Sequence, residues 1–195
     1  GEAIKSNLTK RKMKESFLEL AEAIPVPKIS ITNVAVRAKV SRGTFYTHYE
    51  NIEYMIVDIG NDVLREMERM ASMTPRYRPL CPDYTPAEQM AHYLYENRRL
   101  FLLLLEEHGD PEFMEKWIGQ FHAFLLRRLR EHDVAPNAET DRILLYLANS
   151  GIRAICNSFR GSLISVTFHT LCMTDSLVYS IAVTQNHLYG PKDFD

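Results

Sequence analysis

Residues 30–49 read SITNVAVRAKVSRGTFYTHY, which is two short helical patterns separated by a tight turn. The first pattern places four apolar residues on one helix face: Ile31, Val34, Ala35 and Ala38. Ser30 stands just before this face and can cap the free amide groups at the helix start. Ser41 has the same place before the second pattern, so we expect a second helix from Arg42.

The second helix carries polar residues where a core helix would carry a broad apolar stripe. Only Phe45 and Tyr49 are spaced to point inward together. The remaining side chains can bond phosphate oxygens or base edges, which is typical of the recognition helix of a helix-turn-helix. The residues expected to contact DNA are Ser30, Lys39, Ser41, Arg42, Gly43, Thr44, Tyr46, Thr47 and His48. The alternative is a solvated amphipathic helix whose aromatic residues only support a small core.

The string SRGTFYTHYEN, at residues 41–51, resembles the recognition-helix signature of TetR-family transcriptional regulators. In that family a Ser-Arg-Gly/Ala-Thr-Phe/Tyr-Tyr run is followed by a His-Phe or Tyr-Phe pair. The preceding ITNVAVRAKV resembles the family's upstream helix, and the match covers roughly residues 9–59. The resemblance implies that Thr44, Tyr46 and His48 contact DNA, and that the protein is a homodimer joined by a four-helix interface.

Two residues depart from the family pattern. Lys39 stands where the family usually has a glycine in the turn. It must either accept a left-handed backbone, at a cost of about 1 kcal/mol, or adopt a different turn. Ile52 stands where the family tends to place a lysine at the start of the fourth helix, so one expected phosphate contact is missing. These departures predict altered or weaker binding to an operator.

Length and charge divide the chain into a basic end and an acidic remainder. Residues 1–48 contain nine Lys and Arg against four Asp and Glu, and the rest contains 14 against 21. The basic end is therefore the one expected to bind nucleic acid. We predict an all-α protein of about nine helices, with a helix-turn-helix DNA-binding domain at residues 1–51 and an effector-binding and dimerisation domain at residues 52–195.

Apolar residues recur at helical spacing along the rest of the chain, at residues 9–24, 52–70, 87–107 with a break near Asn97, 112–131, 138–159 and 175–189. Thr174 is expected to cap the last helix, and residues 161–173 form either a connection or an extension of a neighbouring helix. The helix at 138–159 is apolar on most sides, which indicates burial from two directions. We therefore expect the last two helices to pair with their copies in a homodimer.

Five residues are candidates for a small-molecule site in the larger domain. Trp117 and Phe121 belong to an aromatic stripe, and His122, Asn149 and Arg153 are polar groups within otherwise apolar helices. Asn149 and Arg153 are four residues apart, so they share a helix face and can orient a polar or anionic ligand. The alternatives are ordinary core packing for the aromatic residues, and an interface bond, a salt bridge or simple exposure for the polar ones.

The sequence shows no sign of a catalytic, metal or cofactor site. Its cysteines, Cys81, Cys156 and Cys172, form no close pair, and no two histidines lie three or four residues apart. GxSxG, P-loop and GxGxxG motifs are absent. The longest apolar run, residues 100–105, is far below the roughly 20 residues that cross a bilayer. We expect no enzyme activity, no cofactor, no membrane association and a cytoplasmic location.

These observations favour a homodimeric transcriptional regulator, a repressor released from a near-palindromic double-stranded DNA operator by a small-molecule effector. One alternative is a DNA-binding protein without an effector, regulated by its abundance or by a partner protein. The other is a helical small-molecule-binding protein or enzyme with a vestigial DNA-binding head, which the departures at Lys39 and Ile52 would support.

Overall fold

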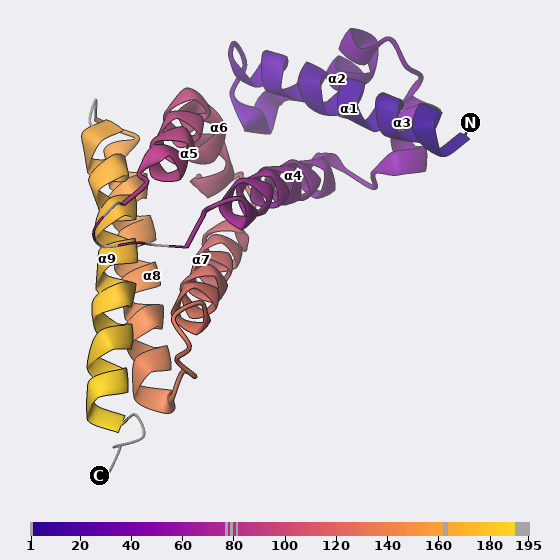
Figure 1. Ribbon diagram of the computed structural model, residues 1–195. Coiled ribbons are helices and arrows are strands. Elements are labelled where there is room, and N and C mark those ends of the chain that lie inside the picture. Colours follow the sequence, from indigo (N-terminus) through magenta and orange to yellow (C-terminus); the bar gives the residue numbers. More distant parts are fainter. Residues whose placement is uncertain (1, 77, 79, 81, 162–163, 190–195) are drawn as a thin grey trace, which may run out of the picture. The chain divides into compact units, whose positions relative to one another are not determined.

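The computed structural model describes residues 2–76, 78, 80, 82–161 and 164–189, which form helices and no strands (Figure 1). The elements are α1 (Glu2–Ala21), a short 3-10 turn η1 (Val26–Lys28), α2 (Ile31–Ala38), α3 (Arg42–His48), α4 (Ile52–Ser72), α5 (Thr85–Glu96), α6 (Arg98–Leu105), α7 (Phe113–Arg130), α8 (Ala138–Ser158) and α9 (Ile164–Tyr189). The predicted all-α fold of about nine helices is confirmed, and the break expected near Asn97 separates α5 from α6.

The chain divides into two compact units. The head unit consists of Gly1–Val63 with Leu103–Phe113, and the body unit consists of Leu64–Leu102 with Met114–Asp195. One boundary falls inside α4 and another inside α6. This division of packing differs from the expected functional boundary after residue 51, which stays a prediction.

The head unit is built around the side chains that α1, α2 and α3 turn toward one another. Helix α1 packs on α2, and α2 packs on α3. Phe45 is fully buried and Tyr49 is 5 % exposed, so the prediction that these two point inward is confirmed. The buried apolar residues of these helices and their surroundings are Met13, Phe17, Ile29, Val34, Ala35, Ala38, Phe45, Tyr49, Met55 and Ile56.

A polar cluster on Asp58 ties α4 to the other helices of the head. The Asp58 carboxylate accepts a hydrogen bond of 2.8 Å from the Tyr49 hydroxyl and pairs with Lys14 Nζ at 2.7 Å and Lys10 Nζ at 3.7 Å. Burial alone would raise the pKa of Asp58, but the hydrogen bonds and positive charges lower it below its usual value. Burial, together with the bond to Asp58, raises the pKa of Tyr49. Lys14, at the basic start of the chain, therefore serves packing within the head.

The turn between α6 and α7 requires a glycine. A Cβ atom at Gly109 would lie 2.3 Å from the Leu104 carbonyl oxygen, far inside van der Waals contact. A second close approach occurs in α4, where a Cβ at Gly60 would lie 3.2 Å from the Phe113 ring. Gly109 thus lets the turn close on the end of α6, and Gly60 lets α4 approach Phe113 within the head unit.

In the body unit, α8 and α9 lie side by side and α9 also packs on α5 (Figure 1). Helix α9 begins at Ile164, so the prediction that Thr174 caps it is wrong. Thr174 lies within the helix, is 8 % exposed, and donates from Oγ1 to the Thr170 carbonyl at 2.7 Å. The β-branched residues before it lower helix propensity, but burial of Thr167 and its contact with Ser158 of α8 favour the helix. The segment left open at residues 161–173 is an extension of α9 from Ile164 onward, and residues 162–163 lie outside the described part.

One stretch of α9, Ser165–Asn186, is long and apolar enough by length and composition to cross a membrane. The sequence analysis considered only uninterrupted apolar runs, and serine and threonine residues interrupt this stretch. Its Asp175 bonds to the buried Arg128 of α7, which is the chemistry of a helix packed in a protein body. Only 22 % of the stretch is buried in the single chain.

Both described cysteines are unpaired thiols, and Cys81 lies outside the described residues. Burial raises the pKa of Cys156 to about 11, and burial and the Asp175 charge raise the pKa of Cys172. Within the described part of the chain, no group of three His, Cys, Asp or Glu side chains could hold a metal ion.

Replacing Asp58 with asparagine should lower the free energy of unfolding by about 1–2 kcal/mol at pH 7, because the side chain is only 26 % exposed and Lys14 loses a charged partner. Since the folded-state pKa of Asp58 is lowered, its contribution is present above the unfolded value of about 3.9 and is lost as the pH falls through the folded value. Urea titrations should therefore show the deficit of the variant shrinking from pH 7 toward pH 3. Glu53→Gln, an exposed carboxylate on the same helix, is the control. A variant as stable as the parent at pH 7 would contradict this role.

Candidate functional site

Side-chain caps fix both helices of the predicted helix-turn-helix. Ser30 Oγ accepts from the Asn33 amide at 3.2 Å, and Asn33 Oδ1 accepts from the Ser30 amide at 2.9 Å. Ser41 Oγ accepts from the Thr44 amide at 2.9 Å and lies 2.8 Å from Thr44 Oγ1. Two serines predicted to contact DNA therefore have a structural role as N-caps, and each remains exposed.

The turn between α2 and α3 uses the left-handed backbone at Lys39, with φ 56° and ψ 45°. Its amide bonds to the carbonyls of Ala35 and Val36, and the Val40 amide bonds to Ala35 at 2.9 Å, which is how a helix commonly ends at a left-handed residue. Of the two alternatives that the sequence left for Lys39, the strained backbone is the one adopted. The lysine side chain is exposed.

Helix α3 presents its polar residues outward, whereas its two aromatic residues lie on different faces, Phe45 on the buried face and Tyr46 on the exposed one. Phe45 packs edge to face with Tyr46, at 6.0 Å between ring centroids, while Tyr46 itself is 52 % exposed. A Cβ at Gly43 would find Ser41 Oγ at 3.6 Å, so the free protein does not need glycine there. Among the predicted contact residues, Ser30, Lys39, Ser41, Arg42, Gly43, Tyr46 and Thr47 are exposed, and Thr44 and His48 are half-buried. The structure thus gathers them on one helix pair, and their contact with DNA stays a prediction.

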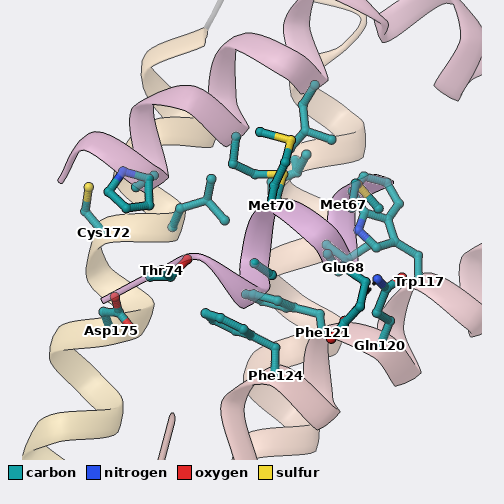
Figure 2. A pocket seen from close by; sticks show the side chains of 18 of the residues that line it. Met67, Glu68, Met70, Thr74, Trp117, Gln120, Phe121, Phe124, Cys172 and Asp175 are labelled. Carbon is teal, nitrogen blue, oxygen red and sulfur yellow. Dashed lines mark hydrogen bonds between the residues drawn. The ribbon is translucent and has the colours of Figure 1, made fainter. Parts of the chain in front are cut away.

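The body unit holds a pocket of about 920 Å³, including its open mouth. Residues from α4, α5, α7, α8 and α9 line it, as does the loop before α5. Figure 2 shows the parallel rings of Phe121 and Phe124 beside Glu68, Gln120 and Trp117, with Asp175 and Cys172 on another wall. An open pocket lined mainly by apolar and aromatic side chains with a few polar groups is the usual form of a small-molecule site.

The pocket contains only part of the predicted ligand site. Trp117 and Phe121 line it, whereas His122, Asn149 and Arg153 are not among its described lining residues. His122 Nε2 lies 3.1 Å from Asp141, and Asn149 Nδ2 donates to the Leu145 carbonyl at 3.0 Å. Arg153 is exposed. The polar residues of α8 share a helix face as expected, but that face does not open into the pocket.

Polar residues of α4 and α7 form one end of the pocket wall. Gln120 Nε2 donates to the Leu64 carbonyl at 2.8 Å and to Glu68 Oε2 at 3.3 Å, and Arg127 Nη1 donates to Glu68 Oε1 at 3.0 Å. Gln120 Oε1 is buried without a hydrogen-bond partner. A buried acceptor left in this state costs free energy, so a donor supplied from the pocket would be favoured.

Arg128, which is 1 % exposed, holds the opposite end. Its guanidinium donates to both Asp175 oxygens, at 2.9 and 3.2 Å, to Glu131 at 2.8 Å and to the Pro75 carbonyl at 2.7 Å. One buried cation thus joins α7, α9 and the chain that follows α4. Because Asp175 also lines the pocket, the network positions one of its acidic groups.

Sequence reasoning missed most of the pocket lining. The missed residues that matter for its chemistry are Met67, Glu68, Met70, Tyr84, Met90, Gln120, Phe124 and Asp175. Met67 and Met70 belong to the apolar spacing of residues 52–70, which was the one sequence signal that could have indicated them as lining residues. Nothing local marks Glu68 or Gln120 as pocket residues, because they meet only when α4 packs on α7.

Two solved structures have a similar helical fold. Thermus thermophilus FadR, a TetR-family transcriptional repressor in complex with lauroyl-CoA, matches with a TM-score of 0.56 and 19 % identity over 87 % of this chain and 93 % of that one. The chain has the TetR-regulator fold. The dihydroxyacetone kinase operon activator DhaS matches with a TM-score of 0.52 and 19 % identity, over 92 % of this chain and 97 % of that one. No protein-family model and no curated protein matches the sequence.

Lys39→Gly should raise the free energy of unfolding by up to about 1 kcal/mol, because glycine adopts the left-handed turn of this TetR fold without strain from a Cβ. Lys39→Ala removes the same charge and keeps the strain, so it should bring no such gain. Urea unfolding followed by circular dichroism measures both. Equal stabilities for the glycine and alanine variants would show that the turn is unstrained.

Proposed function

We propose that this chain is a DNA-binding transcriptional regulator, a repressor that leaves a near-palindromic operator when a small molecule occupies its body unit. The observation that carries the proposal is the capped α2–α3 pair, which presents Arg42, Tyr46 and Thr47 outward in a chain with the TetR fold. Because the cap holds α3 at its end, the outer face of the helix is free to enter a major groove.

Charge in the head supports binding to a polyanion. Residues 1–48 carry an excess of five positive charges, whereas the rest of the chain carries an excess of seven negative ones. Arg37 is engaged by Glu19 at 2.6 Å, and Lys14 by Asp58, so these two stabilise the head itself. Lys39 and Arg42 at the turn and the start of α3 are exposed, where phosphates would be reached. Binding that neutralises phosphates weakens with added salt, because counterions are released.

Apolar side chains on α8 and α9 support a homodimer. The large exposed apolar residues of these helices are Ile143, Leu145, Tyr146, Met173, Leu177 and Val183. Exposed apolar surface on adjacent helices is typical of a protein interface. Two copies joined there would present two recognition helices, which must lie about 34 Å apart to enter successive major grooves. The small residues Ala148 and Gly151 of α8 face other helices of the same chain, since Ala148 is fully buried and a Cβ at Gly151 would lie 3.5 Å from both Phe121 and Thr170.

The pocket supports regulation by an effector. Met67, Glu68 and Met70 of α4 line it, so an occupant would contact the helix that continues into the head unit. A ligand shifts DNA affinity only by its preference for one conformation, typically about 1–3 kcal/mol. The lauroyl-CoA bound by Thermus thermophilus FadR supports an effector site in a body of this kind. The proposed regulator acts in the cytoplasm and needs no cofactor.

Tyr46→Phe should weaken DNA binding by about 5- to 100-fold, because it removes a hydroxyl that would bond a phosphate or base edge. The duplex is one selected from a random library by the parent chain, and fluorescence anisotropy measures its binding. Thermal unfolding should stay within about 0.5 kcal/mol, since Tyr46 is exposed. Gly43→Ala should also weaken binding while the fold is kept, since its Cβ has room only in the free protein. Tyr95→Phe, on α5 of the body, is the matched control. Unchanged affinity in both α3 variants would refute the assignment.

Tyr146→Glu should convert the dimer to a monomer, because it places a charge on a side chain that is 72 % exposed in the single chain and covered in the dimer. Sedimentation equilibrium should show at least a tenfold weaker association, and binding to a two-half-site duplex should fall with it. Ala123→Glu, an exposed position of α7, adds the same charge elsewhere. A parent chain that is monomeric at micromolar concentration would contradict the homodimer.

A further inference from the structure

The polar lining of the body pocket is acidic. Its charged members are Glu68, Asp83 and Asp175, and none of its described lining residues is Lys, Arg or His. The nearest cations that the structure places beside these groups are Arg127, bonded to Glu68, and Arg128, bonded to Asp175 and Glu131. Three carboxylates thus pair with two guanidinium groups, and Asp83 adds a further negative charge to the lining, which leaves the region with an excess of negative charge.

Many of the apolar groups that line the pocket are flat or polarisable. Its lining includes four aromatic residues and three methionines, among them Trp117, Phe121 and Phe124. The rings of Phe121 and Phe124 are nearly parallel, with an interplanar angle of 8° (Figure 2). Ring faces carry negative electrostatic potential and attract cations, most strongly at tryptophan. Arg127 already lies over the Phe124 ring at 5.4 Å, which shows the wall accepting a positive group.

An unsatisfied acceptor lies among these groups. Gln120 uses its amide nitrogen on the Leu64 carbonyl and on Glu68, which directs Gln120 Oε1 elsewhere, and that oxygen is buried without a partner. Gln120 lies beside Glu68 and Trp117 on the same wall (Figure 2). An occupant that donates a hydrogen bond would satisfy Gln120 Oε1 and place its positive end near the Glu68 carboxylate.

We propose that the pocket binds lipophilic cations, namely flat aromatic molecules that carry a positive charge or a protonated amine. This inference rests on the proposed function, in which the same pocket is the effector site. The ring system lies against Trp117 and Phe121, and the cationic end faces Glu68 and Gln120. Anions of the same shape bind poorly, because no described lining residue supplies a positive charge.

Trp117 makes the test direct, since it is the single tryptophan of the sequence and lines the pocket. The probes are 10-methylacridinium as the cation, anthracene-9-carboxylate as an anion of similar shape, and lauroyl-CoA as a larger anion. Quenching of Trp117 fluorescence and calorimetry measure binding to the intact chain. The cation should bind at least tenfold more tightly than either anion. An anion that binds as tightly as the cation, or no binding by any probe, would overturn the inference.

Two variants locate the cationic end. Glu68→Gln and Gln120→Met should each weaken 10-methylacridinium binding, Glu68→Gln by about 10- to 100-fold. Glu66→Gln makes the same change on α4 outside the lining and should leave binding unchanged. Thermal unfolding checks that each variant is folded. If Glu68→Gln is not folded, Gln120→Met alone tests the inference. Full affinity in the folded variants would overturn the inference.

The same probes separate this inference from the proposed function. Cation binding that leaves the selected duplex bound would refute the effector role and leave the ligand class standing. A chain that binds the cation but no duplex would refute DNA regulation and again leave the ligand class standing. Release of the duplex by an anion alone would support an effector role and overturn the ligand class.

Discussion

Helix α4 belongs to both units, and its unbroken backbone is the constraint on which the rest of the structure depends. Its residues up to Val63 pack in the head, and those from Leu64 onward pack in the body. In the first half, Asp58 bonds Tyr49 at the end of α3, and in the second half Glu68 joins the pocket wall. Asp58, which bonds to the end of α3, and Glu68, which lines the pocket, therefore lie on the same continuous helix, α4.

Each unit is further organised by one charged group that bonds to several helices. Asp58 does this in the head with a partly exposed carboxylate, whereas Arg128 does it in the body with a fully buried cation. Removing a partner from a buried charge costs much more than the net value of the pair. The body is therefore the less tolerant of the two to loss of a partner, and Asp175, which holds Arg128, is committed to structure even though it lines the pocket.

Local signals in the sequence predicted the head well, because caps and a helical period are written in neighbouring residues. Ser30 and Ser41 cap the helices as expected, and Phe45 and Tyr49 face inward. The pocket could be predicted only in part, since Trp117 and Phe121 followed an aromatic stripe while Glu68 and Gln120 meet through tertiary packing. Asn149 and Arg153 are not among the described lining residues, because the spacing of two residues on a helix gives their common face and not its surroundings.

The order of helices along the chain has a consequence for biosynthesis. Helices α8 and α9, which carry six of the large exposed apolar side chains, follow the head and α7 in the chain. A ribosome releases a chain from its amino end at about 5–20 residues per second, and earlier domains fold first. The α1–α3 core can thus form before the exposed apolar surface of α8 and α9 has been synthesised. The pocket wall contributed by Ile152, Leu171 and Asp175 is synthesised together with that surface.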